Sequence, residues 1–481
     1  MKVLFLSVNN MWAPHFETEL ELMSDHLDKG DDVYVLTCEK SLPSCTSNQE
    51  RYQTACMKCR SRFWQGMEKI KLSHQNIISL NKRVTFDQIP ESFNTLNELK
   101  QFKAYDAPVG VLVLSSLISE LVEHNFDPLR HKKKVQDKIY TALLVYESTH
   151  QVLKKLKPGA MYLFNGRFAD VGPAVWACQQ LNVPFYTHER GGKMSTYVVF
   201  ENNFLHTALE DIKKEIILLW AEGSPEKEVV GREWFLQRRN GVEQSWFSYA
   251  QRHIKGLLPK GFDSSKRNIA IYNSSIDEFE AFAEWEEPIY GQEHSAVTSI
   301  IQAFQQDASI HFYFRVHPRL KDIDNTQIKQ LKAIEALAPS NLTFIWPEEV
   351  IDSYALMEAC EKTVVFASTI GVEACFWNKP AILIGRAFYE GLDCCYKPKS
   401  HEDLIRLIQA ILQPKDSAQA LKYAFWEETR GIPFKKFVPT GLFAGAFLGE
   451  QIRPKFNFKD KILFKMYSRL DNYRMSKTGT N

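Results

Sequence analysis

Short apolar segments that alternate with helix-patterned segments constrain the fold of this chain most strongly. In the second half of the sequence, apolar runs rich in β-branched and aromatic residues predict strands at 268–273, 310–316, 342–346, 363–367 and 381–385. Helical periodicity predicts helices between them, near 294–306, 326–337, 352–360 and 370–377. Strands that alternate with helices in this way form parallel sheets with helices packed on their faces.

The first half of the sequence shows the same alternation. A strand is predicted at 3–8, a helix at 16–28 that Gly30 ends, and a strand at 32–37. A second set follows, with a strand at 160–166, a helix at 171–181 and a strand at 183–188. Because 481 residues are enough for two domains of ordinary size, we predict an α/β fold with two Rossmann-like, doubly wound domains that face a cleft.

The stretch "LLPKGFDSSKRN" at 257–268 is rich in Pro, Gly, Ser and basic residues, which is typical of a linker. It divides the chain into a predicted N-terminal domain over residues 1–262 and a C-terminal domain over residues 263–425. Residues 426–481 are predicted to form C-terminal helices and a basic tail.

Composition excludes several classes of protein. The net charge of +1 gives no bulk attraction to nucleic acid. The apolar run at the start is too short for a signal peptide. The longest uncharged apolar run, at 109–119, is far shorter than the roughly 20 residues that span a bilayer. We therefore expect a cytoplasmic protein without a transmembrane helix.

Four strand exits in the second half carry polar residues: Asn273-Ser274-Ser275, then Arg315 with His317-Pro318 and Arg319, then Ser368-Thr369 with Gly371 and Glu373, then Gly385-Arg386. Ligands bind beyond the carboxyl ends of strands in such sheets. Hydroxyl groups and backbone N–H groups at a strand-to-helix turn can hold a phosphate, and Arg and His add positive charge. One such exit could be a helix cap, but four on one edge predict a nucleotide site.

"FRVHP", with "FASTIGVEACFWNKPAILIGRAFYEGL" at 366–392, resembles the bacterial capsule-polysaccharide-biosynthesis glycosyltransferases of the GT-B fold, which are similar to Kdo transferases and bacterial sialyltransferases. The resemblance implies that His317-Pro318 and Ser368-Thr369 hold the CMP of a CMP-sugar donor, and that Glu373 meets the ribose. The full donor site it implies comprises Ser274, Ser275, Arg315, His317, Pro318, Ser368, Thr369, Gly371 and Glu373. Related folds that use UDP-sugars or CDP-glycerol also carry His-Pro after a strand.

Two segments of the first half, 164–172 and 186–204, resemble the same family. Inverting transfer needs a general base, and we predict that Glu189 is this base and that His317 is the second catalytic residue. Asn165, Arg167 and Glu17 are predicted to bind the acceptor. The alternatives are that His15, Glu17 or Glu19 acts as the base, and that Glu189 only forms an ion pair with Arg167 or Arg190.

Four of the nine cysteines fall within 22 residues: Cys38, Cys45, Cys56 and Cys59. Four thiolates are a common structural zinc set, although these gaps do not match a standard zinc ribbon. Both a zinc site and a group of reduced cysteines remain open. No other cofactor is expected beyond the nucleotide-sugar.

The segment 453–477 holds eight Lys or Arg and two Asp. A helical wheel places seven apolar residues on one face: Phe458, Ile462, Leu463, Met466, Tyr467, Leu470 and Tyr473. This pattern is typical of a helix that lies on an anionic membrane surface. The alternative is a helix packed on the body of the protein.

We therefore expect an inverting, metal-independent glycosyltransferase. It would move a Kdo-like or sialic-acid-like sugar from a CMP-activated donor to a surface polysaccharide or lipid-linked acceptor. The N-terminal domain would bind the acceptor, and the C-terminal domain the nucleotide. The expected location is the cytoplasm or the inner face of the cytoplasmic membrane. The alternatives are a UDP- or GDP-sugar transferase, a CDP-glycerol phosphotransferase and a non-catalytic polysaccharide assembly protein.

Overall fold

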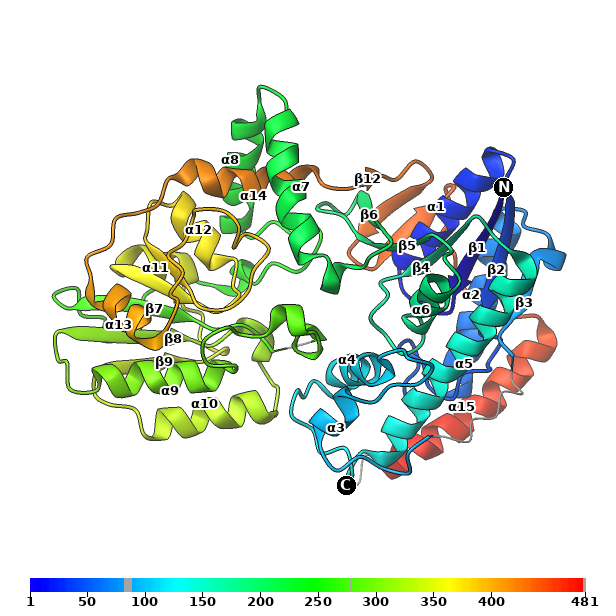
Figure 1. The fold of residues 1–481 in the computed structure, drawn as a ribbon, viewed down its shortest axis with the longest axis horizontal. Coiled ribbons are helices and arrows are strands. Elements are labelled where there is room, and N and C mark those ends of the chain that lie inside the picture. The colour runs from blue at the N-terminus through cyan, green and yellow to red at the C-terminus, as the bar shows by residue number, and fades with distance from the viewer. Residues whose placement is uncertain (82–88, 277, 479–481) are drawn as a thin grey trace. The chain divides into compact units, whose positions relative to one another are not determined.

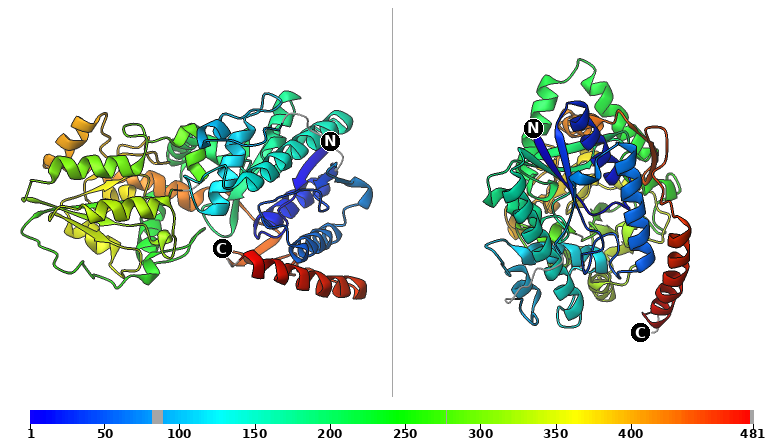
Figure 2. Two further views of the ribbon diagram at one scale, coloured as in Figure 1. Left: turned by 90° about the horizontal axis from the view of Figure 1, so that it is seen from below. Right: turned by 90° about the vertical axis from the view of Figure 1, so that its right-hand side faces the viewer.

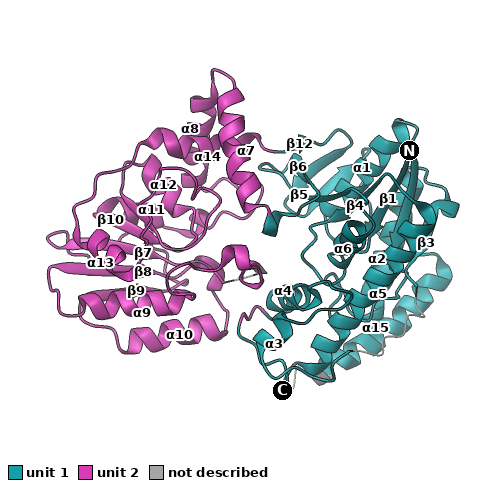
Figure 3. Ribbon diagram, viewed as in Figure 1, with its two compact units in different colours: residues 1–121, 125–207, 431–481 teal, residues 122–124, 208–430 magenta. Residues whose placement is uncertain are grey.

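The computed structural model describes residues 1–81, 89–276 and 278–478 (Figure 1). It divides into two compact units (Figure 3). Unit 1 comprises residues 1–121, 125–207 and 431–481, and unit 2 comprises residues 122–124 and 208–430. Within the described residues, no helix combines the length and the apolar character needed to cross a membrane.

Unit 1 is built on a seven-stranded sheet with the order β12-β6-β5-β4-β1-β2-β3. The strands are β1 (Lys2–Ser7), β2 (Asp32–Thr37), β3 (Ile77–Ser79), β4 (Ala160–Phe164), β5 (Phe185–Arg190), β6 (Thr196–Glu201) and β12 (Ile432–Pro433). The five neighbouring strands β3, β2, β1, β4 and β5 are parallel. Strand β6 pairs antiparallel with β5, and β12 pairs antiparallel with β6. The α/β alternation of the first half therefore produces the expected parallel sheet.

Successive side chains of β1 enter two different cores, because strand residues point alternately to opposite faces. Leu4 and Leu6 pack into the core beneath α5 and α6, whereas Val3 and Phe5 pack beneath α1 and α2. The helices of unit 1 are α1 (His15–Asp28), α2 (Gln53–Lys69), α3 (Leu96–Lys100), α4 (Val109–Leu121), α5 (Lys132–Leu156), α6 (Pro173–Gln180) and α15 (Phe458–Thr478), and a hairpin is formed by β13 (Phe437–Gly441) and β14 (Ala444–Phe447).

Unit 2 is built on an all-parallel sheet with the order β11-β10-β7-β8-β9. Its strands are β7 (Arg267–Tyr272), β8 (Ile310–Arg315), β9 (Leu342–Ile345), β10 (Lys362–Val365) and β11 (Ala381–Leu383). Its helices are α7 (Leu209–Glu222), α8 (Lys227–Arg239), α9 (Glu293–Phe304), α10 (Thr326–Ala336), α11 (Ser353–Ala359), α12 (Ile370–Phe376), α13 (His401–Gln409) and α14 (Ser417–Thr429). The chain builds outward from β7 in both directions, so a topological switch point lies between β7 and β10.

The predicted α/β class with two Rossmann-like domains is confirmed, and each predicted strand is observed within two residues of its predicted ends. The units divide the chain differently from the predicted boundaries. Residues 208–262 lie in unit 2 and residues 431–481 return to unit 1. Residues 208–262 join unit 2 through contacts such as the stacking of Phe235 of α8 on Phe376 of α12, with the ring centroids 4.2 Å apart. Residues 431–481 join unit 1 because β12 pairs with β6 and Phe437 and Phe447 are buried in a core of that unit.

Gly385, at the exit of β11, lies where a side chain would strike the neighbouring strand exit. A Cβ atom there would come within 2.3 Å of the Phe366 carbonyl oxygen. We expect Gly385→Ala to destabilise the protein by about 1–3 kcal/mol, because a backbone atom cannot move aside as a side chain can. The matched control is Gly441→Ala, where a Cβ would meet no atom within 4 Å. Thermal unfolding measures both, and equal melting temperatures would contradict the expectation.

Candidate functional site

A cavity of about 470 Å³ in unit 2 is lined by residues from the four polar strand exits predicted from the sequence. Its lining includes Ser274 and Ser275 after β7, His317 and Arg319 after β8, Ser368 and Thr369 after β10, and Gly385 and Arg386 after β11. The switch point between β7 and β10 lies at this edge of the sheet. This is the position at which open α/β sheets bind nucleotides.

Glu293, the first residue of α9, links the exits of three strands. Its carboxylate is buried and accepts hydrogen bonds from the Asn273 side chain (3.1 Å), the Gln327 side chain (2.9 Å) and the Ser274 N–H (3.1 Å). Asn273 Oδ1 in turn accepts from the His317 N–H (2.6 Å), and Ser274 Oγ accepts from the Ala367 N–H (3.1 Å). Burial raises the pKa of Glu293 to about 7. Glu293 is therefore a positioning residue that sequence reasoning missed.

His317 is neutral at neutral pH. Burial, together with the positive charges of Arg319 and Arg315, lowers its pKa to about 4. Its Nδ1 accepts a hydrogen bond from the Arg319 N–H (3.2 Å), which leaves the proton on Nε2. His317 is therefore not the positive charge that the sequence predicts at this strand exit. The structure makes it a neutral donor, and only its Nε2–H can serve a phosphate.

Arg315 and Glu373 line a smaller cavity of about 110 Å³, which shares Tyr249, His317, Ser368 and Thr369 with the larger one and also contains Pro318. The Arg315 guanidinium is buried and donates to the carbonyl oxygens of Trp346 (2.6 Å) and Glu349 (3.2 Å). Glu373 is also buried, where it pairs with Arg238 (3.1 Å) and accepts from the Tyr354 hydroxyl. Both charges are thus committed to protein partners.

Gly371 lines neither cavity. A Cβ atom on it would lie 2.5 Å from the Tyr389 hydroxyl oxygen, and that hydroxyl donates to the Ser368 carbonyl (2.5 Å). Gly371 therefore acts through packing, because it lets Tyr389 approach and hold the Ser368 turn.

Several lining residues come from segments that the sequence analysis did not place at the site: Arg238 of α8, Trp246, Tyr249 and His253 after it, and Tyr423 and Glu427 of α14. Arg238 donates to the Thr369 hydroxyl (3.0 Å) and so fixes the second residue of the Ser-Thr pair. The density of aromatic and basic residues across 234–253 was the available signal.

The larger cavity does not have an excess of positive charge. Four glutamates line it, Glu280, Glu287, Glu293 and Glu427, against the two arginines Arg319 and Arg386. Arg386 also forms an ion pair with Glu390 (3.2 Å). An anion in this cavity would therefore depend mainly on hydroxyl and N–H donors at the strand exits, and less on the charge of the lining.

In unit 1, the carboxyl edge of the sheet brings Glu189 and Asn165 together. Glu189 Oε1 accepts from the Asn165 side chain (2.6 Å), and its Oε2 accepts from the Arg190 N–H (3.2 Å). Asn165 and Gly166 both have positive φ, 57° and 90°, and form the tight turn that ends β4. Glu189 remains partly exposed, so its carboxylate can reach a substrate.

The other two predicted acceptor residues lie in different environments. Arg167 is buried, donates to the hydroxyls of Ser115 (3.1 Å) and Ser119 (3.0 Å), and lies over the Phe168 ring. Glu17 is 2% exposed and forms an ion pair with Arg62. Burial raises the pKa of Glu17 although Arg62 opposes the change. The Glu17 carboxylate is therefore inaccessible to an acceptor.

His15 is the alternative base that the geometry keeps open. Its ring lies 4.1 Å from that of Phe164 and 6.4 Å from that of His188, measured between centroids. Burial, with Arg190 and His188 nearby, holds the pKa of His15 well below its usual value, so the imidazole is neutral but a weaker base than a free histidine. Glu19 is less suitable, because it is buried and accepts from the Ser7 hydroxyl.

The four clustered cysteines line one cavity of about 40 Å³: Cys38, Cys45, Cys56 and Cys59. Burial raises the pKa of three of these thiols, that of Cys59 to about 12. Zinc requires thiolates, and no group of three or more His, Cys, Asp or Glu in the described part of the chain is placed to hold a metal ion.

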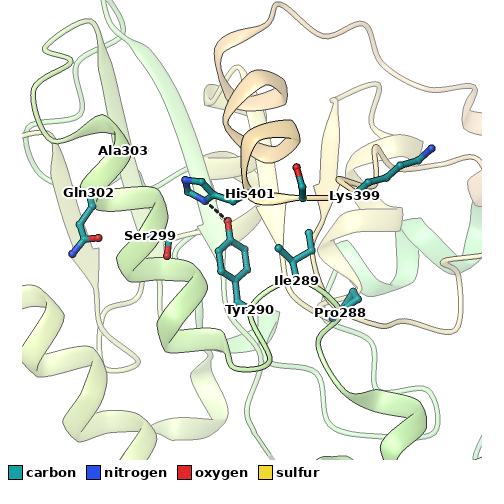
Figure 4. A pocket seen from close by; sticks show the side chains of 9 residues that line it. Pro288, Ile289, Tyr290, Ser299, Gln302, Ala303, Lys399 and His401 are labelled. Carbon is teal, nitrogen blue, oxygen red and sulfur yellow. Dashed lines mark hydrogen bonds between the residues drawn. The ribbon is translucent and has the colours of Figure 1, made fainter.

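Unit 2 has another hollow, of about 750 Å³, between α9 and the start of α13 (Figure 4). Here the Tyr290 hydroxyl meets His401 Nδ1 at 2.7 Å, while Ser299 and Gln302 project from α9. It contains none of the predicted site residues and lies away from the strand exits. We assign it no ligand.

The chain is an α/β protein with two Rossmann-like units, one of which has polar strand exits around a cavity at its switch point, the position where open α/β sheets bind ligands. Residues 287–402 match the family described as "Capsule polysaccharide biosynthesis protein". This segment carries both His317-Pro318 and Ser368-Thr369, and the match confirms the resemblance predicted from the sequence. Among curated proteins, none matches this sequence.

Similar solved structures include two Kdo transferases and one epimerase. The chain is 12% identical to the KpsC β-Kdo 2,4-transferase of Thermosulfurimonas dismutans, covering 64% of this chain and 87% of that one with a TM-score of 0.36. It is 14% identical to the β-Kdo 2,7-transferase of the same protein, covering 58% of this chain and 79% of that one with a TM-score of 0.34. It is 13% identical to UDP-GlcNAc 2-epimerase from Neisseria meningitidis, solved bound to UDP-GlcNAc, covering 98% of this chain and 100% of that one with a TM-score of 0.29. With TM-scores below 0.5, these overlays transfer no residue role to this chain.

Two of the histidines that line these cavities, His317 and His253, make stability depend on pH. The pKa values of His317 and His253 are lowered to about 4 by burial and nearby arginines, against 6.5 for a free histidine. Between pH 4 and 6.5 each of these histidines binds more protons in the unfolded chain than in the folded protein, so its own contribution to the free energy of unfolding falls as the pH falls. The raised pKa of Glu293 contributes with the opposite sign over the same range. In His317→Asn or His253→Gln, the change of the free energy of unfolding with pH should become less steep. The decrease should correspond to the loss of up to one proton bound on unfolding. Denaturant titrations at pH 5 and 7 measure the slope, and an unchanged slope in both variants would contradict the assignment.

Proposed function

We propose that this protein is a glycosyltransferase of polysaccharide biosynthesis that takes a sugar from a nucleotide-sugar donor, most specifically a CMP-linked Kdo-like or sialic-acid-like sugar. The observation that carries the proposal is the convergence of four polar strand exits on one cavity at the switch point of unit 2. The family match over residues 287–402 supports the same conclusion, because it includes both motifs of this cavity.

In this proposal, unit 2 holds the nucleotide. Ser274, Ser275, Ser368 and Thr369 supply hydroxyl and backbone donors for the phosphate. As the bond between the sugar and the phosphate breaks, negative charge grows on the departing phosphate oxygen. The neutral His317 donates its Nε2–H to that oxygen, and a donor fixed by its other nitrogen needs no reorganisation at this step.

Unit 1 supplies the acceptor site and the base. Glu189 removes the proton of the acceptor hydroxyl, the new bond forms at the anomeric carbon, and the nucleotide leaves with the electron pair of the old bond, which inverts that carbon. The hydrogen bond from Asn165 orients the carboxylate of Glu189. The acceptor in this proposal is a surface polysaccharide or a lipid-linked sugar.

CMP should raise the melting temperature of the protein. Binding at about 100 times the dissociation constant adds about 2.7 kcal/mol to the free energy of unfolding. We expect His317→Ala and Ser368→Ala to weaken this stabilisation, because each removes a donor that faces the cavity. The matched control is Ser299→Ala, which lies in the separate hollow of Figure 4.

Thermal shift with CMP, CDP, UDP and GDP measures the effect and discriminates the alternatives. If UDP or GDP stabilises the protein strongly and CMP does not, the donor is a UDP- or GDP-sugar and the CMP assignment is wrong. Stabilisation by none of them would leave a non-catalytic assembly protein, and product mass would separate sugar transfer from phosphoglycerol transfer.

Glu189→Gln should abolish transfer and leave nucleotide affinity near the wild-type value. A base acts in the transition state, so its loss should lower turnover by a factor of about 100 to 10,000. The matched control is Glu201→Gln, at the end of the neighbouring strand β6. Turnover assays with calorimetric nucleotide binding measure both quantities. Retained turnover in Glu189→Gln would move the role of base to His15.

A further inference from the structure

Helix α15 is fastened to unit 1 by a polar residue. The Asp471 carboxylate is 1% exposed and accepts hydrogen bonds from the Gln53 N–H (3.2 Å), the Thr54 N–H (2.9 Å) and the Thr54 hydroxyl (2.7 Å). It thereby caps the N-terminus of α2. Burial raises the pKa of Asp471, but these hydrogen bonds outweigh burial and hold the pKa below its usual value. The carboxylate is therefore charged at neutral pH and favoured by the helix dipole.

The segment that leads into α15 also follows α2. Arg62 Nε donates to the Ile452 carbonyl (3.0 Å), and Ser61 bonds both the carbonyl and the N–H of Lys455. Ile452 itself is buried in a core of unit 1. Lys58 lies over the Phe464 ring, so the contact extends into the first turns of the helix. Contacts at both ends fix how α15 is rotated about its own axis, and Figure 2 shows it along the flank of unit 1.

That rotation leaves the apolar side of α15 in solvent. Phe458 is 78% exposed, Ile462 47%, Met466 58% and Leu470 55%. These positions are four residues apart, so their side chains form one stripe along the helix. An ordinary surface helix buries such a stripe in the core. Here the helix is packed on the body, as one alternative predicted, but the buried side is that of Asp471. A contiguous exposed apolar stripe marks an interaction surface.

The charges beside the stripe indicate what covers it. Lys459, Lys461, Lys465 and Arg469 are all exposed on α15. The two acidic residues of the helix do not balance them, because Asp471 is buried against α2 and only Asp460 remains. A second copy of this chain would bring two sets of positive charges together at the stripe. An anionic lipid surface would accept both the apolar side chains and the cations.

We propose that the exposed face of α15, defined by Phe458, Ile462, Met466 and Leu470 with the adjacent basic residues, binds the protein to an anionic membrane surface. The helix is already folded and oriented, so no ordering of the segment accompanies binding. The association is reversible, and it weakens with salt because part of it is electrostatic. It does not depend on the nucleotide site, so its failure would leave the proposed function untouched.

Vesicle co-sedimentation of the full chain tests the proposal with point variants, since a truncation near residue 452 would disturb the buried Ile452. The probe is vesicles of phosphatidylcholine with 30% phosphatidylglycerol, against pure phosphatidylcholine, at low and high salt. The stripe variant is Ile462→Asn with Met466→Asn, and the charge variant is Lys461→Glu with Lys465→Glu. The matched controls are Leu337→Asn with Ile411→Asn, which are exposed apolar residues of unit 2, and Lys332→Glu.

We expect the wild type and the controls to bind anionic vesicles and to detach at high salt. Each basic residue near an anionic surface contributes about a fivefold factor in partitioning. The charge variant should therefore lose at least 25-fold, and the stripe variant should lose a comparable factor while keeping wild-type helicity by circular dichroism. Binding of either variant at the wild-type level, or equal binding to pure phosphatidylcholine, would overturn the proposal. Concentration-dependent dimers that the stripe variant abolishes, without vesicle binding, would assign the face to a second copy.

Discussion

The cavity at the strand exits of unit 2 depends on one buried carboxylate. Glu293 accepts three hydrogen bonds from the side chains of Asn273 and Gln327 and from the Ser274 N–H, and Asn273 and Ser274 pass this constraint to the exits of β8 and β10. Removing the Glu293 carboxylate would leave its three donors without an acceptor. Each buried donor that lacks a hydrogen bond lowers the free energy of unfolding by about 1–3 kcal/mol. The placement of the hydroxyls that face the cavity therefore follows from the position of α9, whose first residue is Glu293.

Most buried charges around this site serve structure and not the ligand. Arg315 holds the turn after β9 through two carbonyl oxygens, and Arg238 binds Glu373 and Thr369 together. Burying a charge is costly unless it is paired or hydrogen-bonded, and the terminal nitrogens of Arg315 and the carboxylate of Glu373 have such partners within the protein. The cavity consequently offers neutral donors, such as His317 Nε2–H and the serine hydroxyls, whose number and direction are fixed before a ligand arrives.

The sequence predicted the strands and the polar exits well, because both depend on local patterns. A buried parallel strand is a short apolar run, and the residue after it must lie at the carboxyl edge of the sheet. What could not be predicted are pairs of residues far apart in the chain. Glu17 and Arg62, Arg238 and Glu373, and Asp471 and Thr54 meet only through tertiary packing. This packing buries Glu17 and Glu373, which were predicted as site residues, and it also buries Asp471.

Two titratable groups that line the cavity, Glu293 and His317, also couple anion binding to protons. The pKa of Glu293 is about 7 and that of His317 about 4, and both values belong to a cavity without a ligand charge. A phosphate placed among these groups would make the ionised carboxylate less favourable and the protonated imidazole more favourable, so it would raise both pKa values. Binding an anion at neutral pH should then take up protons on Glu293 more than on His317, because the pKa of Glu293 lies nearer to neutral pH. By linkage, the affinity of the cavity for an anion rises as the pH falls through 7. At lower pH, protonation of His317 and His253 destabilises the folded protein and limits this increase.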